Sequence, residues 1–485
     1  MRIVALLPFA LVAAPATAQI QFQQLGSVDL SSTAGSANPE YIGSNPSAVA
    51  WNGTDLYVAG FNGGGATGVG IVRVSSALTT PTIGASFNFI VGTPAARGFS
   101  GLDIEGGRVA AAYDDGAADA QGLQVFDLAG LAQWSFNMRG GSGVGFDPGF
   151  AGVDLGVGWT TFGSGRRALQ DSASGASIYT TANGMIINPA GGTFWRDVDF
   201  DATNGDFYAR KGNDVIKAVR TAGNSCSPSL LVNLTDADSV GGQNLAVIDA
   251  SFGKYVIYND RATTGVGQNF ATVVRVATDA GAAVTASFGA FAPPTSAGYY
   301  DFSWNAADQT LAVLDFTNRT VTIFRVSPTP SSTPICFGDG SGTACPCGNN
   351  GAAGNGCANS LNANGANLAT SGVSSSGADT LVLAGSGMPN SSALYYQGSM
   401  TIAGGAGSVF GDGLRCAGGN VIRLGIKQNI AGASQYPDAG DPSVSVRGMV
   451  VQGSRVYQVW YRNSAAFCAS ETFNLTNGVS VVWGL

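Results

Sequence analysis

The sequence predicts an all-β protein, a six-bladed β-propeller followed by a β-sandwich that disulfides staple. Three observations lead to this architecture. A strand–turn–strand unit recurs about every fifty residues as far as Val326, and this is the length of one propeller blade. Glycine reaches 71 of 485 residues and supplies the positive φ angles that tight turns between strands demand. Six of the seven cysteines follow Val326, where the repeat stops.

Residues 1–18 are typical of a secretory signal peptide. A single basic residue, Arg2, precedes an apolar run from Ile3 to Ala14, and the small-residue site ATA follows at 16–18. The run is too short to span a bilayer of roughly 30 Å, and no later stretch is apolar for long enough. We therefore expect a secreted protein, extracellular or on the cell surface, with no membrane span.

Residues 19–326 contain six copies of the repeat, which begin with SAVAW, SGLDI, AGVDL, RDVDF, LAVID and YDFSW. Their equivalent apolar residues lie 45 to 54 residues apart: Val49, Leu102, Val153, Val198, Ile248 and Phe302. The third copy, AGVDLGVGWTTF, is the loosest. The strands between Ser164 and Ala190 are poorly delimited, which leaves seven blades as the alternative count.

The last copy predicts how the ring closes. It holds three strands and then meets a Pro- and Ser-rich stretch at Ser327. A spare strand, QFQQLGSVDL, stands near the N-terminus from Gln21 to Leu30. We expect this strand to complete the last blade, because a closed ring leaves no exposed sheet edge to invite aggregation.

The composition excludes several functional classes. The chain has no histidine, so Ser-His-Asp and Cys-His catalysis and histidine-ligated metal centres are ruled out. Its net charge of −8 argues against nucleic acid as a partner, since neutralising phosphates needs Lys and Arg. This acidic balance favours solubility and is compatible with binding Ca²⁺.

Acidic residues recur at one position of the repeat: Asp103, Asp154, Asp199 and Asp249. One interpretation is a ring of carboxylates near the central channel, which binds Ca²⁺ or serves as acid and base. In the other, each carboxylate accepts hydrogen bonds from backbone N–H groups of a turn or a neighbouring strand. We favour the second interpretation.

The stretch DFDATNGD, residues 199–206, is similar to a calcium-binding loop. Its residues Asp199, Asp201 and Asp206 are the weak Ca²⁺ candidates of the chain, and no other cofactor is implied. The glycine is displaced by one position and the expected glutamate is missing, so a turn between two strands is the simpler interpretation.

The stretch SPTPSSTP, residues 327–334, predicts an extended, semi-rigid spacer. Residues 335–485 then form the second domain. Short strand-like runs continue from Asp379 to the end of the chain, and their number and length favour a β-sandwich.

The cysteines of the second domain predict three disulfides: Cys336, Cys345, Cys347, Cys357, Cys416 and Cys468. Zinc spacing and a CxxC redox motif are both missing, and thiols oxidise outside the cell; metal binding is the alternative. Cys345 and Cys347 are too close to favour bonding each other. We expect them to pair with Cys336 and Cys357, in an order that stays open, and Cys416 to pair with Cys468. Cys226 is left as a free thiol in a loop.

Residues 335–485 also resemble a known family. In order, they contain CFGDGSGTACPCGNNGAAGNGCANS, GSGMPNSS, GGAGSVFGDGLRCAGG, QYPDAGDPSVSVRG, YQVWYRNSAAFC and FNLTNGVSVVW. These pieces are similar to a Cys-rich C-terminal module shared by secreted proteins of planctomycete-type bacteria. The resemblance implies a tail common to exported proteins and carries over no catalytic residue. The repeats resemble bacterial β-propellers in fold only.

The favoured function is that of an exported, non-enzymatic binding or surface protein. Its propeller would bind a polysaccharide or a cell-envelope component, and its second domain would attach or display it. Four aromatic residues are offered for stacking on sugars, unless they are blade core: Trp159, Trp195, Tyr299 and Tyr300.

Two alternatives stay open. One is a structural envelope or matrix component. The other is a polysaccharide hydrolase or lyase that depends on carboxylates or on Ca²⁺, with four candidate residues: Asp197, Asp199, Asp206 and Asp301.

Overall fold

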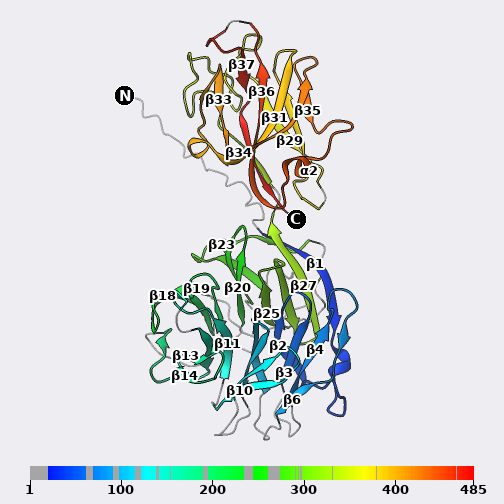
Figure 1. The fold of residues 1–485 in the computed structure, drawn as a ribbon, viewed down its shortest axis with the longest axis vertical. Coiled ribbons are helices and arrows are strands. Elements are labelled where there is room, and N and C mark those ends of the chain that lie inside the picture. Colours follow the sequence, from blue (N-terminus) through cyan, green and yellow to red (C-terminus); the bar gives the residue numbers. More distant parts are fainter. Residues whose placement is uncertain are drawn as a thin grey trace, which may run out of the picture. The chain divides into compact units, whose positions relative to one another are not determined.

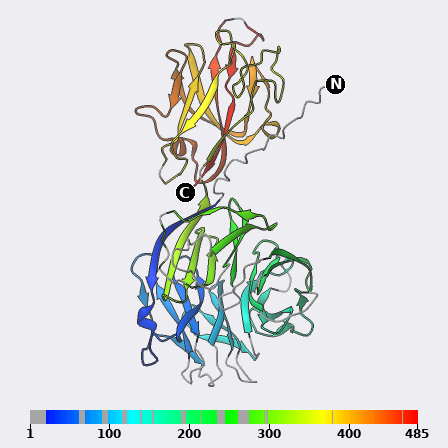
Figure 2. The same cartoon turned by 180° about the vertical axis from the view of Figure 1, so that it is seen from behind.

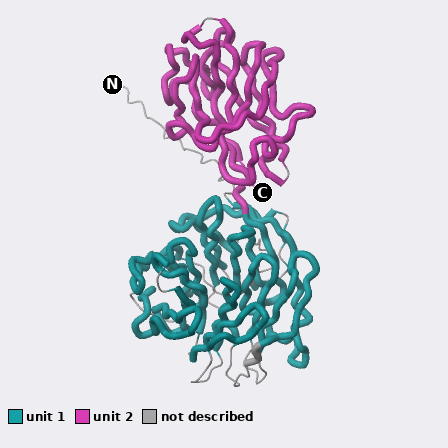
Figure 3. The backbone as a smooth tube through the Cα atoms, viewed as in Figure 1, with its two compact units in different colours: residues 1–326 teal, residues 327–485 magenta. Residues whose placement is uncertain are grey.

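The structure, a computed structural model, describes residues 20–61, 69–90, 98–114, 122–137, 141–152, 155–188, 195–212, 214–233, 244–259, 274–289, 291–292, 294, 298–329, 331–377, 379–465 and 467–484. The chain divides into two compact units, Met1–Val326 and Ser327–Leu485 (Figure 3). The division falls where the sequence repeats stop. The signal peptide expected at 1–18 lies outside the described residues.

Within its described residues, the first unit consists of six antiparallel blades, each with four strand positions (Figure 1). The innermost strands are β2 (Asn45–Trp51), β7 (Gly98–Glu105), β11 (Gly141–Asp147), β16 (Trp195–Phe200), β20 (Leu245–Ala250) and β25 (Tyr299–Asn305). The second strands are β3 (Leu56–Phe61), β8 (Arg108–Asp114), β12 (Gly156–Thr161), β17 (Phe207–Lys211), β21 (Gly253–Asn259) and β26 (Thr310–Asp315). The third strands are β4 (Val69–Ser75), β9 (Leu123–Asp127), β13 (Arg166–Asp171), β18 (Asp214–Ala222), β22 (Val274–Thr278) and β27 (Thr320–Pro328).

The outermost positions are filled less regularly. In blade order they hold β5 (Thr82–Ile83) with β6 (Phe87–Ile90), β10 (Ala132–Phe136), β14 (Ser177–Tyr179) with β15 (Met185–Ile186), β19 (Ser225–Asn233), β23 (Ala283–Val284) and β1 (Ile20–Asp29). The short strand β24 (Ala286–Ser287) pairs with the outer side of β1, and the 3₁₀ turn η1 (Ser31–Thr33) follows β1.

The ring is closed by the N-terminal strand, as predicted. Each innermost strand contacts the innermost strand of the next blade, and β25 contacts β2. The last blade has the strand order β24-β1-β27-β26-β25, so β1 supplies its fourth main strand. Figure 2 shows β1, in dark blue, beside β27. The propeller fold is therefore confirmed, with six blades within the described chain.

Apolar side chains fill the spaces between blades. Val58 of blade one lies in one buried cluster with Leu314 of blade six, and Tyr208 of blade four clusters with Val247 of blade five. Because each blade is packed on both faces, a strand such as β26 is buried along its whole length. Such strands show continuous apolar runs in sequence instead of an alternating pattern.

The third repeat was placed one strand too late. Its innermost strand is β11, and the AGVDLGVGWTTF stretch supplies β12, the second strand. Three glycines in GSGVGFD conceal the apolar pattern of β11. Gly143 permits close approach of the next blade, because a Cβ there would lie 2.6 Å from the Val198 nitrogen. Val153 and Asp154 lie outside the described residues.

A buried ion triad joins blades three and four. The Asp147 carboxylate forms ion pairs with Arg167 at 2.9 Å and with Arg220 at 2.6 Å. None of the three side chains has exposed surface. Burial lowers the pKa of Arg167 to about 10, although the Asp147 carboxylate acts in the opposite direction. The Arg167 guanidinium also lies over the Phe200 and Phe207 rings. This joint depends on charge pairing as well as on apolar packing.

The second unit is a β-sandwich, as predicted. Its larger sheet has the order β28-β38-β36-β31-β34 with β37 beside β36, and its smaller sheet has the order β29-β30-β35. Their strands are β28 (Ser331–Ile335), β29 (Asn367–Ser371), β30 (Val382–Ser386), β31 (Ser392–Thr401), β34 (Ala417–Gln428), β35 (Ser434–Tyr436), β36 (Gly453–Arg462), β37 (Phe473–Leu475) and β38 (Gly478–Trp483). The remaining elements are the hairpin strands β32 (Ser408–Phe410) and β33 (Gly413–Arg415), the turn η2 (Ala403–Gly405) and the short helix α2 (Val444–Gly448).

The core of this unit lies between its two sheets. Leu368 and Leu383 of the smaller sheet pack with Tyr395, Tyr457 and Trp483 of the larger one. The Trp483 indole N–H donates to the Tyr457 hydroxyl at 2.9 Å, which satisfies a polar group inside an apolar layer. Half of the stretch expected as a spacer, residues 331–334, is built into this sheet, since β28 pairs with β38.

Six cysteines form three disulfides, as predicted, but only the pairing of Cys345 with Cys357 agrees with the expected pairs; Cys336 bonds neither Cys345 nor Cys347, and Cys416 does not bond Cys468. The bonds join Cys336 to Cys416, Cys345 to Cys357 and Cys347 to Cys468. Cys416 does not pair with Cys468, because pairing of Ile335 in β28 with Gly478 in β38 places Cys336 next to Cys416. Such proximity depends on strand order and not on spacing in the chain.

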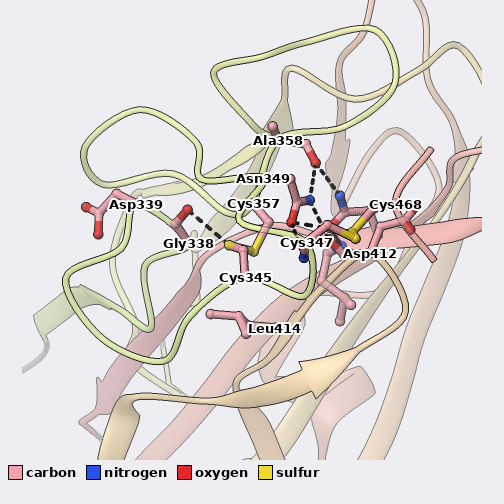
Figure 4. The surroundings of a disulfide bond; sticks show 12 residues. Gly338, Asp339, Cys345, Cys347, Asn349, Cys357, Ala358, Asp412, Leu414 and Cys468 are labelled. Carbon is pink, nitrogen blue, oxygen red and sulfur yellow. Dashed lines mark hydrogen bonds between the residues drawn. A yellow bond between two sulfur atoms is a disulfide. The ribbon is translucent and has the colours of Figure 1, made fainter.

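The loops around the disulfides are held by asparagine side chains. In Figure 4, the Asn349 amide lies between the Cys345–Cys357 and Cys347–Cys468 bonds. Its Nδ2 donates to the carbonyls of Ala358 at 3.0 Å and Asp412 at 2.9 Å. These contacts explain how a stretch with little apolar material keeps a defined shape: cross-links and side-chain amides replace a core.

Cys226 forms no disulfide and lies in β19 instead of a loop. Its thiol donates to the Ile186 carbonyl at 3.3 Å. Burial raises the pKa of the Cys226 thiol to about 11, which keeps it protonated and poorly nucleophilic at neutral pH.

Candidate functional site

A cavity of about 370 Å³ lies where the innermost strands of the propeller converge. Residues of all six innermost strands line it. Aromatic and aliphatic side chains make up much of its wall, among them Trp51, Phe146, Val247 and Trp304. Pockets of this size are typical of ligand sites in proteins.

Four of the six carboxylates that line this cavity form one level and come from alternate blades: Asp103 of β7, Asp197 and Asp199 of β16, and Asp301 of β25. Asp197 and Asp301 are buried, whereas Asp103 and Asp199 are half-buried. The strands between them carry smaller or apolar residues at the facing positions, including Gly143 and Gly145 of β11. At this level acid-bearing strands thus alternate with strands that bear no acid, although Asp249 also lines the cavity from β20.

Each of these carboxylates makes the same pair of hydrogen bonds. One oxygen accepts from the amide of the following residue, as when Ile104 N–H donates to Asp103 at 2.8 Å. The other oxygen accepts from the innermost strand of the next blade. These inter-blade donors are the amides of Phe146 to Asp103 (2.6 Å), Leu245 to Asp197 (3.0 Å), Val247 to Asp199 (2.7 Å) and Val49 to Asp301 (2.7 Å).

The carboxylates therefore tie neighbouring blades together, as the favoured sequence interpretation holds. Two partners were missed at the sequence level. Ser303 accepts from the Trp51 amide at 2.9 Å, and Asn244 donates to Asp301 at 3.2 Å. A signal exists for the first, because Ser303 follows Asp301 by two residues just as Asp199 follows Asp197.

Burial dominates the electrostatics of this ring. Burial, and after it the charge of Asp199, raises the pKa of Asp103 to about 7, against the effect of two backbone N–H groups. Burial likewise raises the pKa of Asp199 to about 6. The pKa values of Asp197 and Asp301 are raised well above the ordinary range for the same reason. Proton uptake by Asp103 and Asp199 therefore occurs near neutral pH.

The four carboxylates proposed for a hydrolase do not all meet. Asp197, Asp199 and Asp301 line one cavity, whereas Asp206 is not among its lining residues and lies at the β16–β17 hairpin. Asp206 accepts from the Arg220 amide at 2.8 Å and from the Asn204 side chain. Because backbone amides occupy the oxygens of the three cavity carboxylates, their arrangement favours structure over acid–base chemistry.

The three Ca²⁺ candidates do not fit a calcium site. Asp199 lies in the cavity ring, while Asp201 accepts from Thr203 and pairs with Lys254. Asp206 is engaged as described above. Across the described part of the chain, no group of three or more acidic or cysteine side chains gathers in a way that would hold a metal ion. The stretch is a turn between β16 and β17, with Gly205 at φ +74°.

Asp249, the remaining acidic position of the repeat, also lines the cavity. Burial raises its pKa, and Lys254 approaches it at 4.0 Å.

Two of the aromatic residues offered for sugar stacking are blade core instead. Trp159 is buried and donates to Gln170 at 2.6 Å, and Trp195 is fully buried. The side chains of Tyr299 and Tyr300 lie outside the described residues.

The rim of the cavity holds side-chain groups that no hydrogen bond within the described residues engages. Asn52, Glu105 and Asn305 lie at the ends of innermost strands and line the cavity. The side-chain oxygens of Asn52 and Asn305 cap turns, accepting from Asp55 and Asp308. Among the described residues, no acceptor engages either Asn amide nitrogen, and no donor engages the Glu105 carboxylate. This rim offers two donors and one acceptor to a ligand.

None of the helices in the described part of the chain is long and apolar enough to cross a membrane.

Comparisons with known proteins add a likeness in fold. No protein-family model matches the chain, and no curated protein matches it, so the resemblance of residues 335–485 to the Cys-rich module stays a prediction. Among solved structures, the chain is similar to an auxiliary nutrient binding protein of Bacteroides thetaiotaomicron, with 10% identity, a TM-score of 0.41 and coverage of 59% of this chain and 69% of that one.

Two further structures are similar at the same level. An auxiliary nutrient binding protein of Bacteroides ovatus has 14% identity and a TM-score of 0.39, with 56% of this chain and 66% of that one covered. A gluconolactonase of Xanthomonas campestris has 10% identity and a TM-score of 0.38, with 59% and 88% covered. At such identities no residue or activity carries over, and the propeller is defined by its own six blades.

Proposed function

We propose that this is an exported, non-enzymatic binding protein, whose propeller binds a polysaccharide and whose C-terminal unit attaches it to the cell envelope. The observation that supports the proposal is the rim of the propeller cavity. Asn52 and Asn305 present amide donors, Glu105 presents an acceptor, and Trp304 adds an aromatic surface. Hydroxyl-rich ligands are recognised by this combination of amides, carboxylates and aromatic rings.

The test uses the full exported chain on a glycan array, followed by calorimetry with the polysaccharides that bind. The variants N52D and N305D keep the oxygen that caps each turn, remove the amide donor and add one negative charge. Each lost hydrogen bond should weaken binding by about threefold to tenfold. The matched control is N420D, which makes the same charge change in the C-terminal unit.

Two results would contradict the proposal. One is failure of the wild-type chain to bind any glycan or any envelope fraction. The other is equal binding by N52D, N305D and N420D, which would place the ligand elsewhere. Release of reducing sugar would favour the hydrolase alternative, which the hydrogen-bonded state of Asp197, Asp199 and Asp301 does not support.

A further inference from the structure

The larger sheet of the C-terminal unit bears an exposed apolar groove on its outer side. One row across three strands holds Ile426, Leu394 and Trp460, and the next row places Arg423 beside Tyr396. All five residues line a groove of about 410 Å³. The β32–β33 hairpin also contributes to the lining, through Phe410 and Arg415.

The groove continues into a second hollow around α2. Val421 and Arg423 line both, and the second is also lined by Ile422, Pro442, Val446, Arg447 and Met449. We call the combined surface the β34 face: Leu394, Tyr396, Phe410, Arg415, Val421, Arg423, Ile426, Val446, Arg447, Met449 and Trp460. Ile426 is 70% exposed, Val446 69% and Met449 74%. Scattered apolar residues are ordinary at a surface, but a contiguous patch marks an interaction site.

The charges of the β34 face have one sign. Three arginines line it, and neither hollow is lined by an acidic residue. Asp441, next to the lining residue Pro442, is already paired with Lys427. Among the described residues, Arg423 makes no ion pair or hydrogen bond. A protein of net charge −8 thus presents a local basic surface, and its complement is an anionic partner.

The partner must also be apolar. Val421, Ile426, Val446 and Met449 are aliphatic, and aliphatic side chains gain little from contact with hydroxyl-rich sugars. Basic and apolar residues together on one surface are typical of segments that bind the interface of an anionic membrane. The two hollows share Arg423, so one charged group lies between two apolar regions.

We propose that the β34 face docks the protein on an anionic lipid bilayer. Its aliphatic side chains enter the interfacial layer, and Arg415, Arg423 and Arg447 pair with lipid phosphates. This inference rests on the attachment role proposed above for the C-terminal unit and names its partner. If the chain still fractionates with the envelope but does not bind lipid, the attachment role stands and the lipid partner falls.

The test is sedimentation of the full exported chain with vesicles. Phosphatidylcholine vesicles that contain phosphatidylglycerol should bind the chain, added salt should weaken binding, and pure phosphatidylcholine vesicles should bind it poorly. R423Q and R447Q should each lower partitioning by about fivefold, from the usual contribution of one arginine near an anionic surface. R455Q, outside the face, is the charge control.

Apolar insertion is tested separately. I426N should lower partitioning, whereas L361N, which alters a residue 75% exposed outside the face, should not. On wild-type chain, vesicles should protect residues 408–410, 421–426 and 446–449 from hydrogen exchange, a measurement that needs no variant. Equal binding to both vesicle types, no binding, or protection elsewhere would overturn the proposal. So would a dimer in solution that I426N dissociates, because the occupant would then be a second copy.

Discussion

The inner carboxylates make the stability of the propeller depend on pH in an unusual direction. The pKa of Asp103 is raised from 3.8 to about 7 in the folded chain, so between these values the folded state holds a proton that the unfolded state has released. Stability is then fully present below pH 3.8 and falls as pH rises through 7, with a slope of about 1.4 kcal/mol per pH unit. Over the whole window the loss is about 4 kcal/mol.

Asp103 borders the solvent of the cavity, so screening reduces this figure, and we expect a loss of about 2 to 4 kcal/mol. The variant D103N cannot titrate and should lack this part of the slope. The assay is urea unfolding of wild-type and D103N chains at a series of pH values from 4 to 8. The difference in unfolding free energy should move in favour of D103N as pH rises.

Asp199 and Glu105 are the other acidic groups that act on Asp103, and both raise its pKa. The variant D199N should therefore lower the apparent midpoint of the Asp103 transition. Parallel pH profiles for wild-type and D103N chains would refute the reasoning. So would a wild-type stability that increases from pH 4 to pH 7, since an ordinary ion-paired carboxylate behaves in that way.

Three further predictions concern stability and are checked by calorimetric melting of the exported chain. G143A should destabilise the propeller by about 1 to 3 kcal/mol, because a Cβ would contact the backbone of the next blade, whereas G163A, with open space around it, should be neutral. D147N should cost about 3 to 5 kcal/mol by leaving two buried guanidinium groups uncompensated; a change below about 1 kcal/mol would contradict this. C347S opens a link across 121 residues and should cost about 5 kcal/mol, more than the roughly 3 kcal/mol for C345S, whose link spans 12; the reverse order would count against the chain-entropy account.

Repeat spacing was sufficient to predict the propeller and its closing strand. The last repeat lacks a fourth strand, and the N-terminal segment contains one strand that no repeat uses. Few chain arrangements are compatible with both observations. The same pattern failed at β11, where Gly141, Gly143 and Gly145 replace the side chains by which a strand is recognised. Glycine at these positions lets the neighbouring blade pack closely. A contact of this kind, with another part of the chain, leaves no periodic pattern in the sequence.

The candidate site was predicted in part. Asp197, Asp199 and Asp301 do reach the cavity, because they lie on innermost strands of the repeat. Their hydrogen-bond donors were not predictable from the sequence. Each donor is a backbone N–H group on the next blade, and every residue except proline carries such a group. Disulfide pairing failed for a related reason: the Cys336–Cys416 bond depends on the order of strands in a sheet.

The closing strand also decides how the ring would respond to tension. β27 leads directly into the C-terminal unit, so a pull on an anchored tail would enter the propeller through this strand. β27 lies between β26 and β1 and is not an edge of its sheet. Ser27 of β1 and Thr322 of β27, 295 residues apart in the sequence, add a hydroxyl contact of 3.1 Å between these two strands. Force along β27 would have to shear ladders on both of its sides at once, so the joint resists unzipping bond by bond.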